Sequence, residues 1–296
     1  MIISFLSVIK EYNIMRNIFL VLLLLDSITF AKVFSFTTVP DHNVEILKKH
    51  FSKLAVYLEK KLHVKVQFVP TTSYNDSISA FAKNRVQLAW FGALAGIKAR
   101  RTVKGSQAIV QGLEDTQFYS YFIVNTSTGI QRAHKLPKDI EGKNFTFGSK
   151  ESTSGRLMPE YYIRWMLKKT PKEAFSKVGF SGSHSKTIAL VQNGTYQVGV
   201  VNYAVWDKEL KDGKIDTSKV RIIWKTLKYP DYQFSIRGDV DQQFGKGFMQ
   251  KVQNALLAIK DPEILSAFPR SKFIKANNSE YAIVNDIAIA VGLISK

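Results

Sequence analysis

The chain has 296 residues, of which 45% are apolar and only 8 are proline. This composition excludes an intrinsically disordered protein, and the length allows two domains. The net charge is +18, but the lysines are spread along polar helix faces, as in "KKHFSKLAVYLEKK", and no zinc spacing or aromatic RNA motif appears, so we expect no nucleic-acid partner. Cysteine is absent, which excludes disulfide bonds and lipid attachment through a cysteine.

The N-terminal stretch "MRNIFLVLLLLDSITFAK" has the layout of a secretory signal peptide. Arg16 precedes a short apolar core, and the small residues Thr29 and Ala31 follow it, so we predict a signal peptide over residues 1–31 with cleavage after Ala31. The alternative is a retained membrane anchor, although Asp26 interrupts the core and the core is short for a bilayer. Residues 1–14 resemble no part of a signal, so Met15 is an alternative start. We expect the mature protein in the periplasm.

Strands and helices alternate after this segment. Residues 33–40 and the stretches "VKVQFVP", "LAWFG", "SQAIVQGLE" and "FYSYFIVN" are predicted strands, with helices over 43–61 and 74–83. The first helix repeats apolar residues at helical spacing at Leu47, Phe51, Leu54 and Leu58. Such alternation predicts a largely parallel sheet, with ligand contacts on the loops at its carboxyl edge.

A second alternation follows the polar stretch "NTSTGIQRAHKLPKDIEGK". The strands "NFTFGS", "YQVGVV" and "VRIIWKT" are separated by predicted helices over 155–168, 186–193 and 203–211. A strand "QFSIR", a long helix carrying Phe244 to Leu256 and a terminal helix complete the chain. We predict two α/β lobes, the first of residues 32–123 plus 232–296 and the second of 126–229. A hinge of two crossings, near 124–125 and 229–232, would join them.

The stretch "SKESTSGRLMPEYY" places many hydrogen-bond donors at one helix start. Ser152, Thr153 and Ser154 add hydroxyls to the unpaired N–H groups of the first turn, and Gly155 allows a close approach to the backbone. A tetrahedral oxyanion suits such a set of neutral donors. The alternative is a redundantly capped helix whose spare hydroxyls face solvent.

Other candidate ligand-binding residues lie at the ends of predicted elements. His184 in "SGSHSK" precedes a helix, where an imidazole can donate to an anion or neutralise part of its charge; an exposed loop histidine is the alternative. Trp90 and Phe91 end a strand and can line a cleft or pack in the core.

Five segments in this order resemble the periplasmic solute-binding proteins of ABC transporters for phosphate, phosphite and phosphonate, and most of all the branch labelled selenate-type. The segments are "TTVPDHNVEILKKHFSKLAVYLEKKL", "VPTTSYNDSISAFAKNRVQLAWFGALAG", "FGSKESTSGRLMPEYY", "GFSGSHSKTIALVQNGTYQVGVVN" and "VRIIWKT". The resemblance implies the class II periplasmic binding-protein fold, in which two lobes close on a ligand. It also implies a membrane permease as partner; we expect a monomer.

The resemblance further implies particular ligand contacts. His184 would contact the anion, and Tyr74 in "TTSYNDS" would reach it from the first lobe. Asn202 stands where binders of aminoalkyl phosphonates carry a carboxylate, so we expect an uncharged cleft that disfavours an amine. Asp231 in "YPDY" could partly replace that carboxylate, and whether it reaches the ligand is left open by the sequence. Phosphate, phosphite, selenate, sulfate and compact phosphonates all remain candidate ligands.

Two other functions remain as alternatives. The scaffold can present its liganded form to a membrane sensor kinase instead of a permease. A hydrolase is a third hypothesis, but "SGSHS" lacks the G-x-S-x-G motif of a nucleophile elbow. A serine and a histidine that are neighbours in sequence are also no evidence for a catalytic triad. The five histidines are scattered and no P-loop or dinucleotide fingerprint appears, so we expect no enzyme, no metal and no cofactor.

Overall fold

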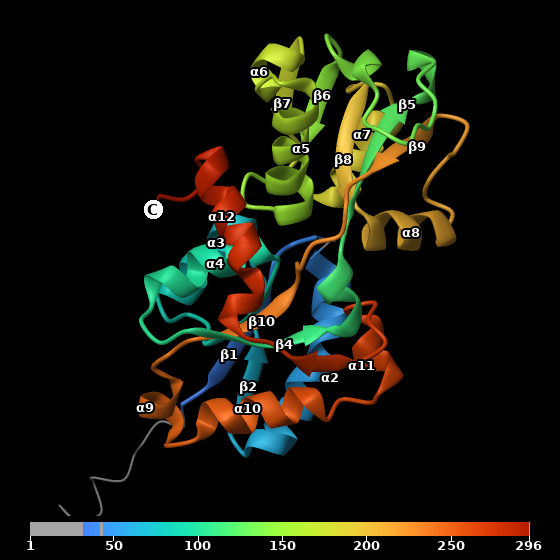
Figure 1. The fold of residues 1–296 in the computed structure, drawn as a ribbon. Coiled ribbons are helices and arrows are strands. Elements are labelled where there is room, and N and C mark those ends of the chain that lie inside the picture. The colour runs from blue at the N-terminus through green and yellow to red at the C-terminus, as the bar shows by residue number, and fades with distance from the viewer. Residues whose placement is uncertain (1–31, 42–43, 296) are drawn as a thin grey trace, which may run out of the picture. The chain divides into compact units, whose positions relative to one another are not determined.

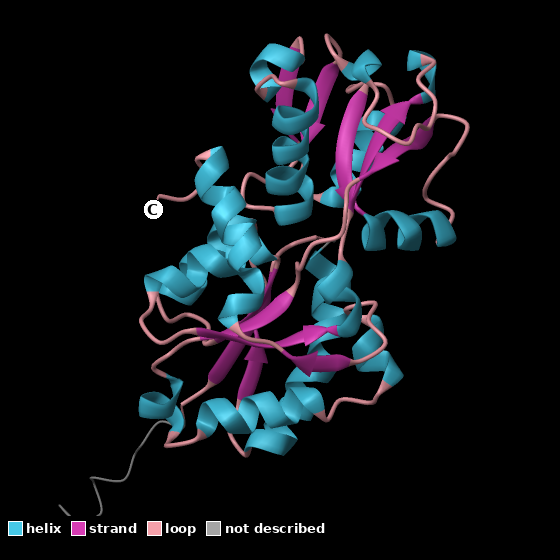
Figure 2. Ribbon diagram, in the orientation of Figure 1, coloured by secondary structure: helices cyan, strands magenta, loops and turns pink. Residues whose placement is uncertain are grey.

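The computed structural model describes residues 32–41 and 44–295, so the predicted signal peptide lies outside the described residues. Two sheets organise the fold (Figures 1 and 2). The first has the order β11-β4-β10-β3-β1-β2, and the second β7-β6-β8-β5-β9. Both are mixed, since β10 and β11 in the first sheet and β5 in the second run antiparallel to their neighbours.

The first sheet contains strands from both ends of the described chain. They are β1 (Phe34–Thr38), β2 (Val66–Phe68), β3 (Leu88–Phe91), β4 (Gln107–Gly112), β10 (Gln233–Ile236) and β11 (Phe273–Lys275). The tail therefore returns to the first sheet. Only β2, β1 and β3 form the predicted parallel part; the returning strands β10 and β11 are antiparallel.

Helices cover both faces of the first sheet (Figure 1). On one face lie α3 (Tyr74–Ala82), α4 (Ala93–Thr102) and α12 (Ala282–Val291), and on the other α2 (Val44–Leu62), α10 (Phe248–Leu257) and α11 (Pro262–Ser266). The predicted apolar stripe of α2 is buried, from Leu47 to Leu58. The long helix expected around Phe244 is instead two helices, α9 (Val240–Phe244) and α10, because Gly245 and Gly247 adopt positive φ angles of 104° and 81°.

The second sheet belongs to the middle of the chain. Its strands are β5 (Ser120–Asn125), β6 (Asn144–Phe147), β7 (Lys177–Phe180), β8 (Val198–Asn202) and β9 (Val220–Lys225). Its helices are α5 (Met158–Leu167), α6 (Pro171–Ala174), α7 (His184–Gln192) and α8 (Tyr203–Lys211). Short helical turns cover Leu113–Gln117, Thr126–Thr128, Lys138–Ile140, Thr153–Leu157 and Asn278–Tyr281.

One strand lies in a different sheet from the one expected. We assigned residues 120–123 to the first lobe, but β5 pairs with β8 and β9 of the second sheet. The apolar residues of β5 are buried on both faces of the strand. Its hydrophobic pattern therefore does not indicate which sheet it joins. The chain therefore crosses between the sheets within residues 113–119 and 226–232, rather than at 124–125. The crossings lie side by side (Figure 1), because Phe118 and Tyr229 exchange two backbone hydrogen bonds of 2.9 Å.

Among the described residues, no helix has the length and apolar character needed to cross a membrane.

Candidate ligand-binding site

Helix starts from both lobes meet between the two sheets. The first lobe contributes the starts of α3 and α4, and the second contributes the starts of α7, α8 and the turn Thr153–Leu157. Contacts across the lobes join them: the N–H of Leu94 donates to Thr153 Oγ1 at 3.0 Å, and Asn202 Nδ2 donates to the Tyr232 hydroxyl at 3.4 Å. Helix starts offer unpaired N–H groups and positive dipole ends, so this junction favours a negative charge.

The donor-rich stretch is buried in this junction. Ser152, Thr153 and Ser154 are at most 2% exposed, so the alternative of spare hydroxyls facing solvent is wrong. Ser152 caps the turn by accepting from the Gly155 N–H at 2.9 Å. The turn is a π-helical turn in which the Met158 N–H bonds to Thr153 O, and α5 begins only at Met158. Single π turns of this kind are frequent at functional sites.

Gly155 is required by a neighbouring side chain. A Cβ at this position would lie 2.9 Å from His184 Cε1 and 3.0 Å from Ser152 Oγ. We expected glycine to admit a ligand to the backbone; in the structure it admits the histidine ring.

His184 is buried with its Nε2 directed into the junction. The residue is 1% exposed, so the alternative of an exposed loop histidine is wrong. Its Nδ1 accepts from the Asn202 N–H at 3.3 Å, and in the neutral ring this places the proton on Nε2. Nε2 lies 3.5 Å from Ser154 Oγ. The ring is therefore oriented as a donor beside the serine hydroxyl.

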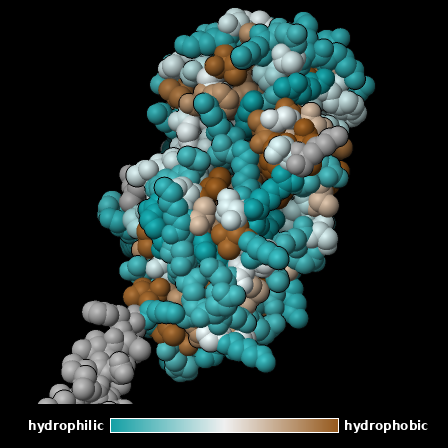
Figure 3. Space-filling model, turned by 90° about the vertical axis from the view of Figure 1, so that its left-hand side faces the viewer, coloured by the Kyte–Doolittle hydropathy of each residue, from teal (hydrophilic) through white to brown (hydrophobic). Residues whose placement is uncertain are grey.

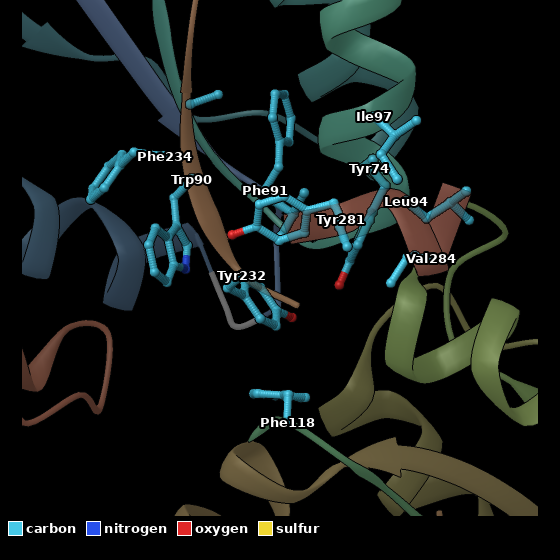
Figure 4. Packing of buried hydrophobic residues seen from close by; sticks show 14 of the residues in the cluster. Tyr74, Trp90, Phe91, Leu94, Ile97, Phe118, Tyr232, Phe234, Tyr281 and Val284 are labelled. Carbon is cyan, nitrogen blue, oxygen red and sulfur yellow. The ribbon is translucent and has the colours of Figure 1, made fainter. Parts of the chain in front are cut away.

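Two tyrosines of the first lobe converge on a carboxylate that sequence analysis missed. The Tyr74 hydroxyl donates to Asp41 Oδ1, and the Tyr232 hydroxyl donates to Oδ2 at 2.7 Å. Burial, together with Asp41, raises the pKa of both tyrosines well above 10.0, so both remain protonated. In Figure 4 both hydroxyl oxygens point toward the second lobe. The expectation of an uncharged cleft is wrong, because Asp41 lies in it.

Asp231 also lies in the junction, in the second crossing. It is fully buried, and its Oδ1 accepts from the Ala93 N–H at 2.9 Å. Its Oδ2 is buried without a hydrogen-bond partner among the described residues. Burial raises its pKa from 3.8 to about 7. A Cβ at Gly92 would lie 3.0 Å from Asp231 Oδ1 and 3.2 Å from Thr153 Oγ1, so carboxylate and hydroxyl are neighbours.

The remaining sequence candidates play different parts. Asn202 caps α8, with its Oδ1 accepting from the Val205 N–H at 2.7 Å. Trp90 is 5% exposed and stacks on Tyr232 at 5.8 Å between ring centroids. Phe91 is fully buried against Phe81 in the core of the first lobe (Figure 4) and is not among these polar groups.

A small cavity of about 40 Å³ opens beside the polar groups. Both lobes line it, with Asp41, Trp90 and Tyr232 on one side and Asn202 and Ala204 on the other. Arg270 also lines it, and its guanidinium donates to both carboxylate oxygens of Asp115, at 2.7 and 2.6 Å. The cavity can admit a small group.

Comparisons with known proteins agree with this geometry. Residues 36–281 match the family described as ABC transporter, phosphonate, periplasmic substrate-binding protein. The chain is 35% identical over 263 residues to the probable ABC transporter phosphite-binding protein PhnD1 of Prochlorococcus marinus (strain MIT 9301), covering 86% of this chain and 89% of that protein.

Solved structures give the same result. The structure of P. marinus PhnD1 in complex with methylphosphonate is 34% identical, with a TM-score of 0.84 over 89% of this chain and 99% of that one. A binding protein component of an ABC phosphonate transporter from Pseudomonas aeruginosa, 20% identical, shares the fold with a TM-score of 0.76 over 88% of this chain and 87% of that one. The chain therefore belongs to the phosphonate-type periplasmic substrate-binding proteins of ABC transporters.

Proposed function

We propose that the protein binds a small phosphorus oxyanion between its lobes and delivers it to an ABC permease. The observation that carries this proposal is the convergence of Ser154, His184 and Tyr74 from both lobes on one buried point. Phosphite, methylphosphonate and phosphate are the ligands that fit, and the methylphosphonate complex of PhnD1 supports this class.

The unpartnered oxygen of Asp231 favours a ligand that carries a proton. The ionised carboxylate gains a hydrogen bond at this buried oxygen only from a donor, and with a pKa of about 7 Asp231 is partly ionised at neutral pH. The monoanions of phosphonates, phosphite and phosphate retain a hydroxyl group, whereas sulfate and selenate at neutral pH do not. We therefore rank sulfate and selenate, both candidates from sequence, below the phosphorus oxyanions.

The cavity favours a compact ligand. The wall includes the apolar side chains of Trp90 and Ala204, which suit a methyl group. The sequence argument from Asn202 against an amine no longer holds, because Asp41 gives the cavity wall a negative charge.

Lobe closure follows from the contacts between lobes. A ligand stabilises the closed form only by contacts that the open form lacks. The Leu94–Thr153 hydrogen bond and the Lys98–Glu151 ion pair join the lobes without a ligand, so we propose that the ligand adds contacts to Ser154 and His184 from one lobe and to Tyr74 from the other. We propose that the segments 113–119 and 226–231 form the hinge, which moves the first predicted crossing from 124–125 and leaves the second near 229.

A binding role without catalysis fits the histidine. In a Ser-His-Asp triad the second ring nitrogen donates to a carboxylate. Here Nδ1 of His184 accepts from a backbone N–H instead. The ring nitrogen that a hydrolase directs at its orienting carboxylate faces a backbone N–H here, and we propose that the Ser154–His184 pair only binds the anion.

The exposed surface supports the expectation of a monomer. Large exposed hydrophobic residues lie on separate segments: Val33, Val56, Leu113, Trp165, Phe180, Leu210, Leu227 and Ile283. On the face in Figure 3, the described residues form a mainly hydrophilic surface with small separate hydrophobic groups. Scattered apolar residues are ordinary on monomers.

A ligand panel tests the proposed function. Thermal unfolding of the mature chain should shift upward with methylphosphonate, phosphite and phosphate, because a ligand at 100 times its Kd stabilises the folded state by about 2.7 kcal/mol. Sulfate and selenate should shift it less, and glucose and glycine not at all. Stabilisation by glucose or glycine, with none by any oxyanion, would overturn the proposal.

Export is the second part of the proposed function. We propose that the mature protein begins at Lys32 and resides in the periplasm, as the family and the signal-like segment indicate. Expression in a double-membraned bacterium should give a periplasmic product whose intact mass corresponds to residues 32–296. A product that sediments with membranes and retains the first 31 residues would contradict this expectation.

A further inference from the structure

Asp41 binds the same side chains that the proposed ligand needs. Its carboxylate accepts from the hydroxyls of Tyr74 and Tyr232, both of the first lobe. From the second lobe, His184 Nε2 lies 3.8 Å from Oδ1, and the Ser185 hydroxyl donates to the Asp41 backbone oxygen at 3.5 Å. The carboxylate is itself an oxyanion, bound between the lobes.

Asp41 and an anionic ligand would compete directly for the same hydrogen-bond donors. A tyrosine hydroxyl has one proton, so a tyrosine that donates to Asp41 has none left for a ligand. The raised pKa values of Tyr74 and Tyr232 exclude a different proton arrangement in which the tyrosines are ionised. An incoming anion has to take these donors from Asp41 or bind next to its negative charge.

No basic residue among those described cancels this charge. In the described part of the chain, the one basic side chain paired with Asp41 is His184, which is charged only when its ring is protonated. Arg270, on the same cavity, is held by Asp115, and Lys98 is paired with Glu151. Asp231 adds a second carboxyl group to the same junction.

We propose that Asp41 is a specificity-determining residue, an internal carboxylate that competes for the ligand's donors and selects against doubly charged anions. The inference rests on the proposed function. Coulomb repulsion grows with ligand charge, so a dianion such as sulfate is opposed about twice as strongly as the methylphosphonate monoanion. Asp41 thus lowers affinity in general and lowers it most for sulfate and selenate.

Asp41→Asn tests this role, since it removes the charge and retains the size and one acceptor. Isothermal titration with methylphosphonate and with sulfate should be done at a pH where the first is mainly singly charged. Affinity for methylphosphonate should rise about tenfold or more, the usual effect of one nearby unit charge. Because sulfate carries two charges, its affinity should rise by about the square of that factor. The ratio of the methylphosphonate affinity to the sulfate affinity should therefore fall.

A matched control removes one carboxylate elsewhere. Asp212 ends α8 at the opposite end from Asn202 and pairs with Lys208 and Lys214. Asp212→Asn should leave the ratio of the two affinities unchanged, which separates a local effect from that of net charge. Circular dichroism checks the fold, and Asp41→Ser is the second variant if Asp41→Asn does not fold.

The outcomes separate the inference from the proposed function. Weaker methylphosphonate binding by Asp41→Asn would mean that Asp41 holds the ligand's proton, and an unchanged ratio would mean that it has no part in selection; both overturn the inference. If the wild type binds no oxyanion, the proposed function fails. In that case, sulfate binding gained by Asp41→Asn would still support the role of Asp41, and no gain of sulfate binding would overturn it.

Discussion

Asp231→Asn is expected to stabilise the ligand-free protein by up to about 4 kcal/mol above pH 7. The pKa of Asp231 rises from 3.8 to about 7 on folding, chiefly because of burial. The folded state therefore binds this proton more tightly than the unfolded state. The contribution of this proton to the free energy of unfolding is fully present below pH 3.8 and is lost as the pH rises to about 7. Asparagine has no charge to bury and keeps an acceptor for the Ala93 N–H.

Urea unfolding of both proteins below pH 3.8 and above pH 7 measures this effect. The two stabilities should be similar at the low pH, and the variant should be the more stable one at the high pH. The same variant should bind methylphosphonate more weakly, because one carboxylate oxygen becomes an NH₂ group. A variant less stable than the wild type above pH 7 would show that Asp231 is ionised at little cost, contrary to its burial.

Ser154→Ala and His184→Ala are expected to weaken methylphosphonate binding by about one to two orders of magnitude. Hydrogen bonds to a charged group contribute about 1.5–3 kcal/mol, and about 1.4 kcal/mol corresponds to a tenfold change in affinity. His184→Ala should have at least the effect of Ser154→Ala, because His184 Nε2 and the Ser154 hydroxyl are neighbours in the same junction. Titration calorimetry measures both.

Controls for these variants come from exposed positions. Ser52 on α2 and His134 are exposed, so Ser52→Ala and His134→Ala should bind like the wild type. Ser154 and His184 are each 1% exposed. Their removal should therefore also cost stability, and binding has to be compared at a temperature where every variant is folded. Wild-type affinity in both site variants would move the anion site elsewhere.

Local patterns predicted most of the elements, and long-range pairing decided the rest. The helices at 74–83 and 203–211 are predicted from the local sequence and are confirmed as α3 and α8. The sheet that residues 120–125 join depends on partners at 198–202 and 220–225. An apolar strand buried on both faces has no pattern that specifies such partners.

Only part of the candidate site could be predicted from local sequence. The stretch 152–155 and His184 could be proposed because helix starts have local sequence signatures. Asp41 was not, because its partners Tyr74 and Tyr232 are 33 and 191 residues away along the chain. A single aspartate after a strand gives no signal of either contact. Asp231 was noticed, but its burial, and hence its pKa, depends on both lobes.

A crystal structure of the mature chain with methylphosphonate tests the central claim most directly. We predict one ligand between the lobes, with its oxygens within hydrogen-bond distance of Ser154 Oγ, His184 Nε2 and an Asp231 oxygen, and its methyl group in the cavity lined by Trp90 and Ala204. Methylphosphonate bound outside this junction, with Ser154 and His184 making no contact to it, would contradict the account.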